Sequence, residues 1–190
     1  MIAFAALVAL CPLANAATFS ELQAAHPDLF DADTGFRIAE QRAETPEDIP
    51  PPSVPVDANK AQQILESGAL AIDVLGAAEQ RYDELDGSWP VNTPRLSLPG
   101  ATWLPEVGRG SLTDIMQHYF EDNLQELTDG DKARQLLFFC VDNCWMSWNA
   151  AQRAASMGYS EVYWFREGTD GWTALDLPLE PVDPVPVNVD

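Results

Sequence analysis

The alternation of short apolar runs with helix-like segments is the feature that most restricts how this chain can fold. Runs typical of buried strands lie at residues 69–75 (ALAIDVL), 101–104, 135–139 (QLLFF) and 161–165 (EVYWF). Segments with a helical spacing of apolar residues lie at residues 58–67, 112–127 and 146–157. A strand that returns to its sheet through a helix makes a right-handed crossover, which keeps the neighbouring strands parallel. We therefore predict an α/β domain with a largely parallel central sheet.

Residues at the ends of the predicted helices support this interpretation. Asp57 has the position of an N-cap before the first helix, and Gly68 follows the end of that helix. Ser111 and Asp114 have the spacing of a capping box with Asp in the acceptor role, which predicts a helix over residues 112–127.

The two ends of the chain are less regular. Residues 1–16 (MIAFAALVALCPLANA) have the apolar run and the small-x-small ending of a secretory signal peptide, so we expect cleavage before Ala17 and export to the periplasm. An uncleaved membrane anchor is the alternative, although the run is shorter than the roughly 20 residues that span a bilayer. We divide the rest into an extended N-terminal arm or linker (17–56), a folded domain (57–179) with an irregular insertion (76–99), and an extended C-terminal tail (180–190).

The net charge argues against two classes of partner. With 30 acidic and 10 basic side chains the chain carries a formal charge of -20. Nucleic acids and anionic lipids are also negative, so we expect no binding to either. No segment after the signal is long and apolar enough for a membrane span. Cationic partners are easier to accommodate, but solubility or adaptation to salt is the simpler explanation of the charge.

Two cysteines lie at the turn between the third predicted strand and the helix that follows it. Cys140 and Cys144 are the pair that remains once Cys11 leaves with the signal. Ligand sites of open α/β sheets lie beyond the carboxyl ends of the strands, and a helix N-terminus stabilises a thiolate. Asp142 in the turn opposes that effect. Three intervening residues allow a disulfide if the turn closes back on itself, so we take both cysteines as candidate catalytic residues; ordinary core residues or a structural disulfide are the alternatives.

Other kinds of site have less support. The histidines are His26 and His118, so a zinc site with four Cys or His ligands would need both. A copper site that adds His118 or Met146 to the two cysteines lacks close spacing. We predict no metal site. Four tryptophans cluster around the turn and the next strand, and core packing explains them better than a docking face does: Trp145, Trp148, Trp164 and Trp172.

Four motifs, in order along the chain, resemble those of the rhodanese-like domain. ALAIDVL resembles its first core strand ending in Asp, and LPGATWLP resembles its I-P-G-A motif. LLFFC resembles the strand that delivers the active-site cysteine, and MGYSEVYWFREGTDGW resembles the G-Y-x-x-V-x-x-L-x-G-G-x-x-x-W stretch. The resemblance covers about residues 57–179. More narrowly, CVDNCWMSWNAAQRA, GATWLPEVGRG and YWFREGTDGW resemble the family that is named for a CXXCW motif and associated with catabolism dependent on pyrroloquinoline quinone (PQQ).

The resemblance implies a fold, a site and a context. The fold would be a five-stranded, mainly parallel sheet with helices on both faces, and Cys140 would hold the position that carries persulfide sulfur in active sulfurtransferases. The loop after it would form a cradle of amides for a persulfide or an anion, made by Val141, Asp142, Asn143 and Trp145. The protein would work beside quinoprotein alcohol dehydrogenases, their cytochrome c or associated transport components. No particular cofactor follows; persulfide sulfur or a redox cofactor is the expectation.

Three features of this chain depart from the family pattern. Leu75 stands where an Arg often follows the strand Asp, Cys144 lies within the cradle, and the loop is one residue longer than usual. A second thiol can attack a persulfide on Cys140, release sulfide and leave a disulfide. We therefore favour a thiol–disulfide pair or redox-cofactor site that supports quinone-dependent alcohol oxidation. The alternatives are a sulfurtransferase with a Cys140 persulfide, and a non-catalytic interaction module with a structural disulfide.

Overall fold

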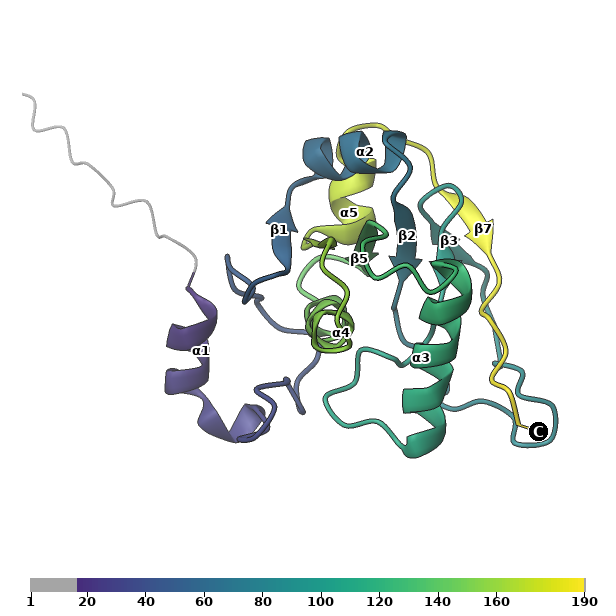
Figure 1. Ribbon diagram of the computed structural model, residues 1–190, viewed down its shortest axis with the longest axis horizontal. Helices are drawn as coiled ribbons and strands as arrows, with labels where there is room; N and C mark the ends of the chain where they lie inside the picture. Colours follow the sequence, from purple (N-terminus) through teal and green to yellow (C-terminus); the bar gives the residue numbers. More distant parts are fainter. Residues whose placement is uncertain (1–16, 190) are drawn as a thin grey trace, which may run out of the picture.

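The computed structural model describes residues 17–189, so the predicted signal lies outside the described residues. Five parallel strands form the central sheet in the order β1-β6-β5-β2-β4 (Figure 1). They are β1 (Val54–Val56), β2 (Leu70–Asp73), β4 (Thr102–Trp103), β5 (Leu136–Phe139) and β6 (Val162–Phe165). A separate antiparallel pair joins β3 (Arg95–Ser97) to β7 (Glu180–Val182). The predicted α/β class and parallel sheet are confirmed.

Helices cover both faces of this sheet, as the resemblance implied. Their bounds are α2 (Ala58–Glu66), α3 (Asp114–Leu127), α4 (Trp145–Ser156) and α5 (Gly168–Thr173). Leu137 and Phe139 of β5 pack in a core cluster with α2 and α5, whereas Leu136 and Phe138 pack in a second cluster with α3 and α4. Successive side chains of a strand point to opposite faces, so a central strand between two helical layers is apolar throughout. No helix in the described part of the chain is long and apolar enough to cross a membrane.

The observed helices differ from the predicted ones mainly at their N-terminal ends. Helix α3 begins at Asp114 because Thr113, and not Ser111, is its N-cap; the Thr113 hydroxyl accepts from the Met116 N–H at 3.3 Å. Helix α4 begins at Trp145, one residue before the predicted start. Strands β3 and β7 lie in segments predicted to be irregular or extended. Their pairing joins residues far apart in the chain, which local patterns do not show.

The segment predicted to be an extended arm or linker is packed onto the domain. It contains α1 (Phe19–Ala25), a short 3-10 helix, η1 (Pro27–Leu29), and the edge strand β1. Phe30 and Ile49 are buried in the core cluster that α3 and α4 share. Pro55 is tolerated in β1 because an edge strand leaves some N–H groups unpaired. The prolines around it are the reason why the sequence did not predict this strand. The sheet therefore begins before residue 57.

One buried amide ties this N-terminal segment to the rest. Asn149 on α4 donates from Nδ2 to the carbonyl oxygens of Arg37 and Gly108, each at 2.9 Å. Its Oδ1 accepts from the Arg37 N–H at 3.0 Å. Gly108 approaches α4 so closely that a Cβ there would collide with the backbone of Met146. Three segments distant in sequence thus meet at a single side chain.

We expect Asn149→Ala to lower the free energy of unfolding by about 3 kcal/mol, because it leaves the buried Arg37 N–H and the Gly108 carbonyl without partners and leaves the Arg37 carbonyl with Gln41 Nε2 as its donor. Urea unfolding followed by circular dichroism measures the loss. Asn123→Ala is the matched control, since Asn123 makes one side-chain bond, to Tyr119 O within its own helix; we expect a change of about 0.5 kcal/mol. Equal losses in the two variants would contradict the role given to Asn149.

Candidate functional site

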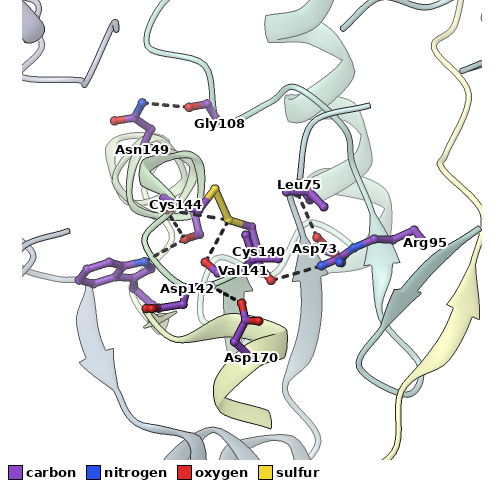
Figure 2. The surroundings of a disulfide bond; sticks show 12 residues. Asp73, Leu75, Arg95, Gly108, Cys140, Val141, Asp142, Cys144, Asn149 and Asp170 are labelled. Carbon is purple, nitrogen blue, oxygen red and sulfur yellow. Dashed lines mark hydrogen bonds and ion pairs between the residues drawn. A yellow bond between two sulfur atoms is a disulfide. The ribbon is translucent and has the colours of Figure 1, made fainter. Parts of the chain in front are cut away.

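The structure joins the two predicted cysteines in a disulfide at the carboxyl end of β5 (Figure 2). Cys140 directly follows β5, and Cys144 is the N-cap residue of α4, with their Cα atoms 6.5 Å apart. The turn between them closes through Asn143, whose φ of 52° lies in the left-handed region that Asn tolerates better than most residues. Both cysteines are fully buried. The prediction that the two thiols can meet is confirmed.

A buried ion pair supports the strand ends beneath the disulfide. Asp73, the last residue of β2, lies in register with Phe139 of β5 and is fully buried. Its Oδ2 accepts from Arg95 Nε at 2.8 Å and from the Ser97 hydroxyl at 2.6 Å. Its Oδ1 accepts from the Leu75 N–H at 3.0 Å. Burial raises the pKa of the Asp73 carboxyl above its usual value, while Arg95 and the hydrogen bonds oppose that rise.

Arg95 connects this pair to the cysteine loop. Its Nη2 donates to the Cys140 carbonyl at 3.2 Å (Figure 2). The Thr169 N–H donates to the same oxygen at 3.1 Å. The family resemblance singled out Leu75, which stands where an Arg often follows the strand Asp. It did not indicate that Arg95, on β3, supplies the charge, because the insertion around β3 has no clear period.

The loop amides expected to form an anion cradle are partly occupied in this disulfide form. The Asp142 N–H donates to Asp170 Oδ2 at 2.7 Å, and the Trp145 N–H donates to the Gln41 carbonyl at 2.9 Å. Val141 forms a bridge with Gly168 in an antiparallel arrangement. The cradle role of Val141, Asp142, Asn143 and Trp145 stays a prediction, and it requires these amides to exchange their present acceptors for a ligand.

Two carbonyl oxygens lie beside the Cys140 sulfur. Sγ lies 3.6 Å from the Val141 carbonyl oxygen and 3.9 Å from the Cys144 carbonyl oxygen. Carbonyl oxygens accept a hydrogen bond from S–H but repel a negative sulfur. The carboxylate of Asp142, which accepts from Asn143 Nδ2 at 2.8 Å, adds negative charge on the same loop. These groups oppose the effect of the α4 N-terminus, in the direction that the sequence indicated for Asp142.

The N-terminal segment covers the loop and the start of α4. The indole N–H of Trp145 donates to the Glu44 carbonyl at 3.0 Å, and that of Trp148 donates to the Asp48 carbonyl at 3.2 Å. The Arg37 guanidinium lies 4.9 Å from the centre of the Trp145 ring, a cation–π contact. Trp164 and Trp172 are buried like the other two. All four clustered tryptophans therefore pack inside the protein, as predicted from core packing, and none presents a docking face.

A surface depression of about 540 Å³ reaches Cys144. Residues of the N-terminal segment form one side, among them Gln41 and Arg42, and Gly76 and Arg109 belong to the other. A larger depression, of about 670 Å³, is lined by residues of the insertion and of α3 and includes neither cysteine. Cys144 is thus the cysteine that adjoins a depression, although both cysteines are buried in the disulfide form. Within residues 17–189, no group of three His, Cys, Asp or Glu side chains is placed to hold a metal ion.

Comparison with known proteins places this geometry in a family. A model of the rhodanese-like domain family matches residues 57–175. No curated protein matches the chain. The Alr3790 protein from Anabaena sp. is a similar solved structure, with 19% identity, 67% of this chain and 80% of that chain covered, and a TM-score of 0.41.

Two further similar structures come from longer proteins. A persulfide form of EanB with ergothioneine has 19% identity and a TM-score of 0.45, over 70% of this chain and 32% of that one. A thiosulfate sulfurtransferase from Pseudomonas aeruginosa has 19% identity and a TM-score of 0.42, over 72% of this chain and 22% of that one. This chain therefore spans less than a third of either protein.

We expect Arg95→Gln to lower the free energy of unfolding by about 3 kcal/mol at about pH 7, because it leaves the buried Asp73 carboxylate without its cation. Loss of the cation also raises the pKa of Asp73 further. The deficit is present above that pKa and is lost as the pH falls through it, because a protonated carboxyl needs no counter-charge. Urea unfolding at about pH 7 and about pH 5 checks both effects.

Arg81→Gln is the control for the Arg95 variant, because the Arg81 side chain is 80% exposed and pairs only with Glu79 within the described residues. An exposed pair of this kind contributes less than about 1 kcal/mol. A deficit of Arg95→Gln that widens at the lower pH would contradict the assignment of Arg95 as the counter-ion of Asp73.

Proposed function

Because the chain belongs to the rhodanese-like domain family, we propose that it is a thiol–disulfide redox protein in which Cys140 and Cys144 alternate between a dithiol and a disulfide. The observation that carries the proposal is the closure of these two residues into a disulfide at the carboxyl end of β5. This edge of a parallel sheet is where α/β proteins place their ligands. The fold relates the protein to sulfurtransferases, but the second cysteine changes the chemistry available to the first.

The environment of Cys140 supports redox exchange over stable sulfur carriage. A persulfide on Cys140 would have the Cys144 sulfur within bonding distance, so Cys144 would displace sulfide and restore the disulfide. Two carbonyl oxygens would also lie beside a negatively charged persulfide on Cys140. Two-electron exchange between a dithiol and an external disulfide has no persulfide anion among its stable states. The two cysteines are either protonated thiols or joined in a disulfide.

The proposed setting comes from the resemblance to the CXXCW family. We propose that residues 1–16 direct export to the periplasm and that the protein assists PQQ-dependent alcohol oxidation there. Its partners in this proposal are a quinoprotein alcohol dehydrogenase, that enzyme's cytochrome c or an associated transport component. The motifs around Cys140, Gly100 and Tyr163 support this setting. In a variant of the proposal, the cysteine pair holds a redox cofactor.

Sulfurtransfer is the second candidate function. The position of Cys140 after the central strand of a rhodanese-like domain supports it. In this scheme, the Cys140 thiolate takes a sulfur atom from a donor such as thiosulfate and forms a persulfide, with sulfite as the leaving group. Cys144 then acts as a resolving thiol that releases sulfide.

We expect the disulfide to be reduced and re-formed without unfolding of the domain. The purified protein, isolated without reductant, should lack free thiols, gain two alkylation sites after mild reduction, and keep its circular dichroism spectrum. Return of the oxidised mass after addition of a low-molecular-weight disulfide completes the cycle. Cys140→Ser and Cys144→Ser should each block the cycle while leaving one thiol free to alkylate.

The same samples separate the other two functions. A mass gain of one sulfur atom on Cys140 after incubation with thiosulfate, together with thiocyanate formation from cyanide, would replace the redox proposal with sulfurtransfer. Unfolding of the domain on reduction would instead identify the disulfide as structural, which would sink the redox proposal.

The setting has its own test in the host cell. Deletion of the gene should impair growth on an alcohol that a quinoprotein dehydrogenase oxidises, and should leave growth on a carboxylic acid unchanged, because only the first requires PQQ-dependent oxidation. A plasmid copy of the wild-type gene should restore growth, whereas a copy with both Cys140→Ser and Cys144→Ser should not. Equal growth of the deletion strain on both carbon sources would refute the proposed setting and leave the redox chemistry intact.

A further inference from the structure

The depression beside Cys144 is lined by two arginines and by one acidic residue, Glu40, which pairs with Arg37. Arg109 and Arg42 both line it, although the whole chain has 10 basic side chains against 30 acidic ones. Arg109 donates from Nε to Glu106, and within the described residues neither of its terminal nitrogens makes a hydrogen bond. Arg42 forms no ion pair in residues 17–189. Two guanidinium groups are thus available to an anionic ligand that enters next to the disulfide.

Two acceptor oxygens without partners among the described residues lie at or beside the same depression. The side chain of Gln41, which also lines the depression, donates from Nε2 to the Arg37 carbonyl at 2.7 Å, and this bond sets the orientation of its amide. Its Oε1 is buried and has no hydrogen-bond partner among residues 17–189. Glu106 Oε1 is a second buried acceptor without a partner among the described residues; it would lie 2.5 Å from a Cβ on Gly76, which lines the depression, although Glu106 itself does not line it. Buried acceptors are normally paired, so these positions fit a ligand that brings its own N–H donors.

Three features of this depression indicate three groups on its ligand. The guanidinium nitrogens suit an anion, the unpaired acceptor suits an N–H donor, and Cys144 suits a sulfur. We infer that the depression binds a small zwitterionic thiol whose carboxylate pairs with Arg109, whose ammonium donates to Gln41 Oε1, and whose sulfur reaches Cys144. A volume of about 540 Å³ has room for an amino acid or a short peptide that carries a thiol. This inference rests on the proposed redox function and names its reducing substrate.

The exchange balances in two steps. Cys144 is buried in the disulfide form, so the ligand first displaces the residues that cover it. The thiolate of the ligand then attacks Cys144 Sγ, a new sulfur–sulfur bond forms, and the Cys140–Cys144 bond breaks with Cys140 leaving as a thiolate. Cys140 then takes a proton from solvent, and the Val141 and Cys144 carbonyls are placed to accept a hydrogen bond from the resulting thiol. A second ligand thiolate attacks the sulfur of the bound ligand and releases Cys144, which is also protonated. The protein gains two electrons, and two ligand thiols become one disulfide.

Four thiols used as reductants test the inference on the purified oxidised protein. Cysteine carries both charged groups, cysteamine lacks the carboxylate, 3-mercaptopropionate lacks the ammonium, and 2-mercaptoethanol lacks both. Rate constants for loss of the protein disulfide are measured by rapid alkylation and intact mass, and each is divided by the fraction of the probe present as thiolate. We expect cysteine to react about tenfold faster than cysteamine and faster than 3-mercaptopropionate, a tenfold ratio being about 1.4 kcal/mol.

Variants assign the two contacts. Arg109→Gln should bring the cysteine-to-cysteamine ratio close to one, and Gln41→Leu should do the same for the ratio of cysteine to 3-mercaptopropionate. Arg81→Gln removes the same charge from an exposed site outside the depression and should keep both ratios. The rate ratios measured with the wild-type protein test the inference by themselves. A variant that does not fold therefore leaves the test valid.

Two outcomes overturn the inference in distinguishable ways. If all four probes reduce the wild-type protein at rates set by their thiolate chemistry alone, the depression selects no zwitterion, and the redox function stands without it. If none of the probes reduces the folded protein, the redox function fails together with the inference.

Discussion

The buried Asp73 carboxylate is the interaction on which the arrangement of the site depends. It accepts from the backbone after β2, from the guanidinium of Arg95 and from the hydroxyl of Ser97, so it joins the end of the central sheet to β3. Arg95 then holds the Cys140 carbonyl, which orients the first residue of the cysteine loop. An isolated charge in this position would be strongly unfavourable, and the ion pair and hydrogen bonds make it tolerable. The pair therefore contributes more to the position of the loop than to net stability.

The sequence predicted those parts of the fold that depend on local signals. Residues 135–139 were recognised as a central strand because every side chain is apolar or adjoins an apolar run, which is what a strand between two helical layers requires. Helix α3 was recognised from its spacing and its capping residues, although Thr113 took the cap in place of Ser111. The sequence also allowed the closure of Cys140 on Cys144, because three intervening residues bring the two cysteines within disulfide range when the turn closes back on itself.

The parts that the sequence did not predict are those set by distant partners. Arg95 and Asp73 are 22 positions apart, and no periodicity links an irregular insertion to the end of a strand. Strand β1 is hidden because Pro55 is acceptable only at an edge, and the edge position is a property of the whole sheet. Gln41 and Glu44 read as part of a proline-rich linker, yet their carbonyls accept the two N–H groups of Trp145. Each of these contacts becomes evident only once the sheet order is known.

The hydrogen bonds between the N-terminal segment and Trp145 also mean that the working unit is larger than the family unit. The rhodanese-like match covers residues 57–175, whereas the carbonyls that hold the start of α4 come from residues 41–48. A domain cut at the family boundary would expose the indoles of Trp145 and Trp148 and leave the first turn of α4 without its acceptors. The part of the chain that matches the family supplies the cysteine loop, and the segment before it covers the start of α4. Such segments are therefore where members of one fold family can differ in what reaches the same cysteine.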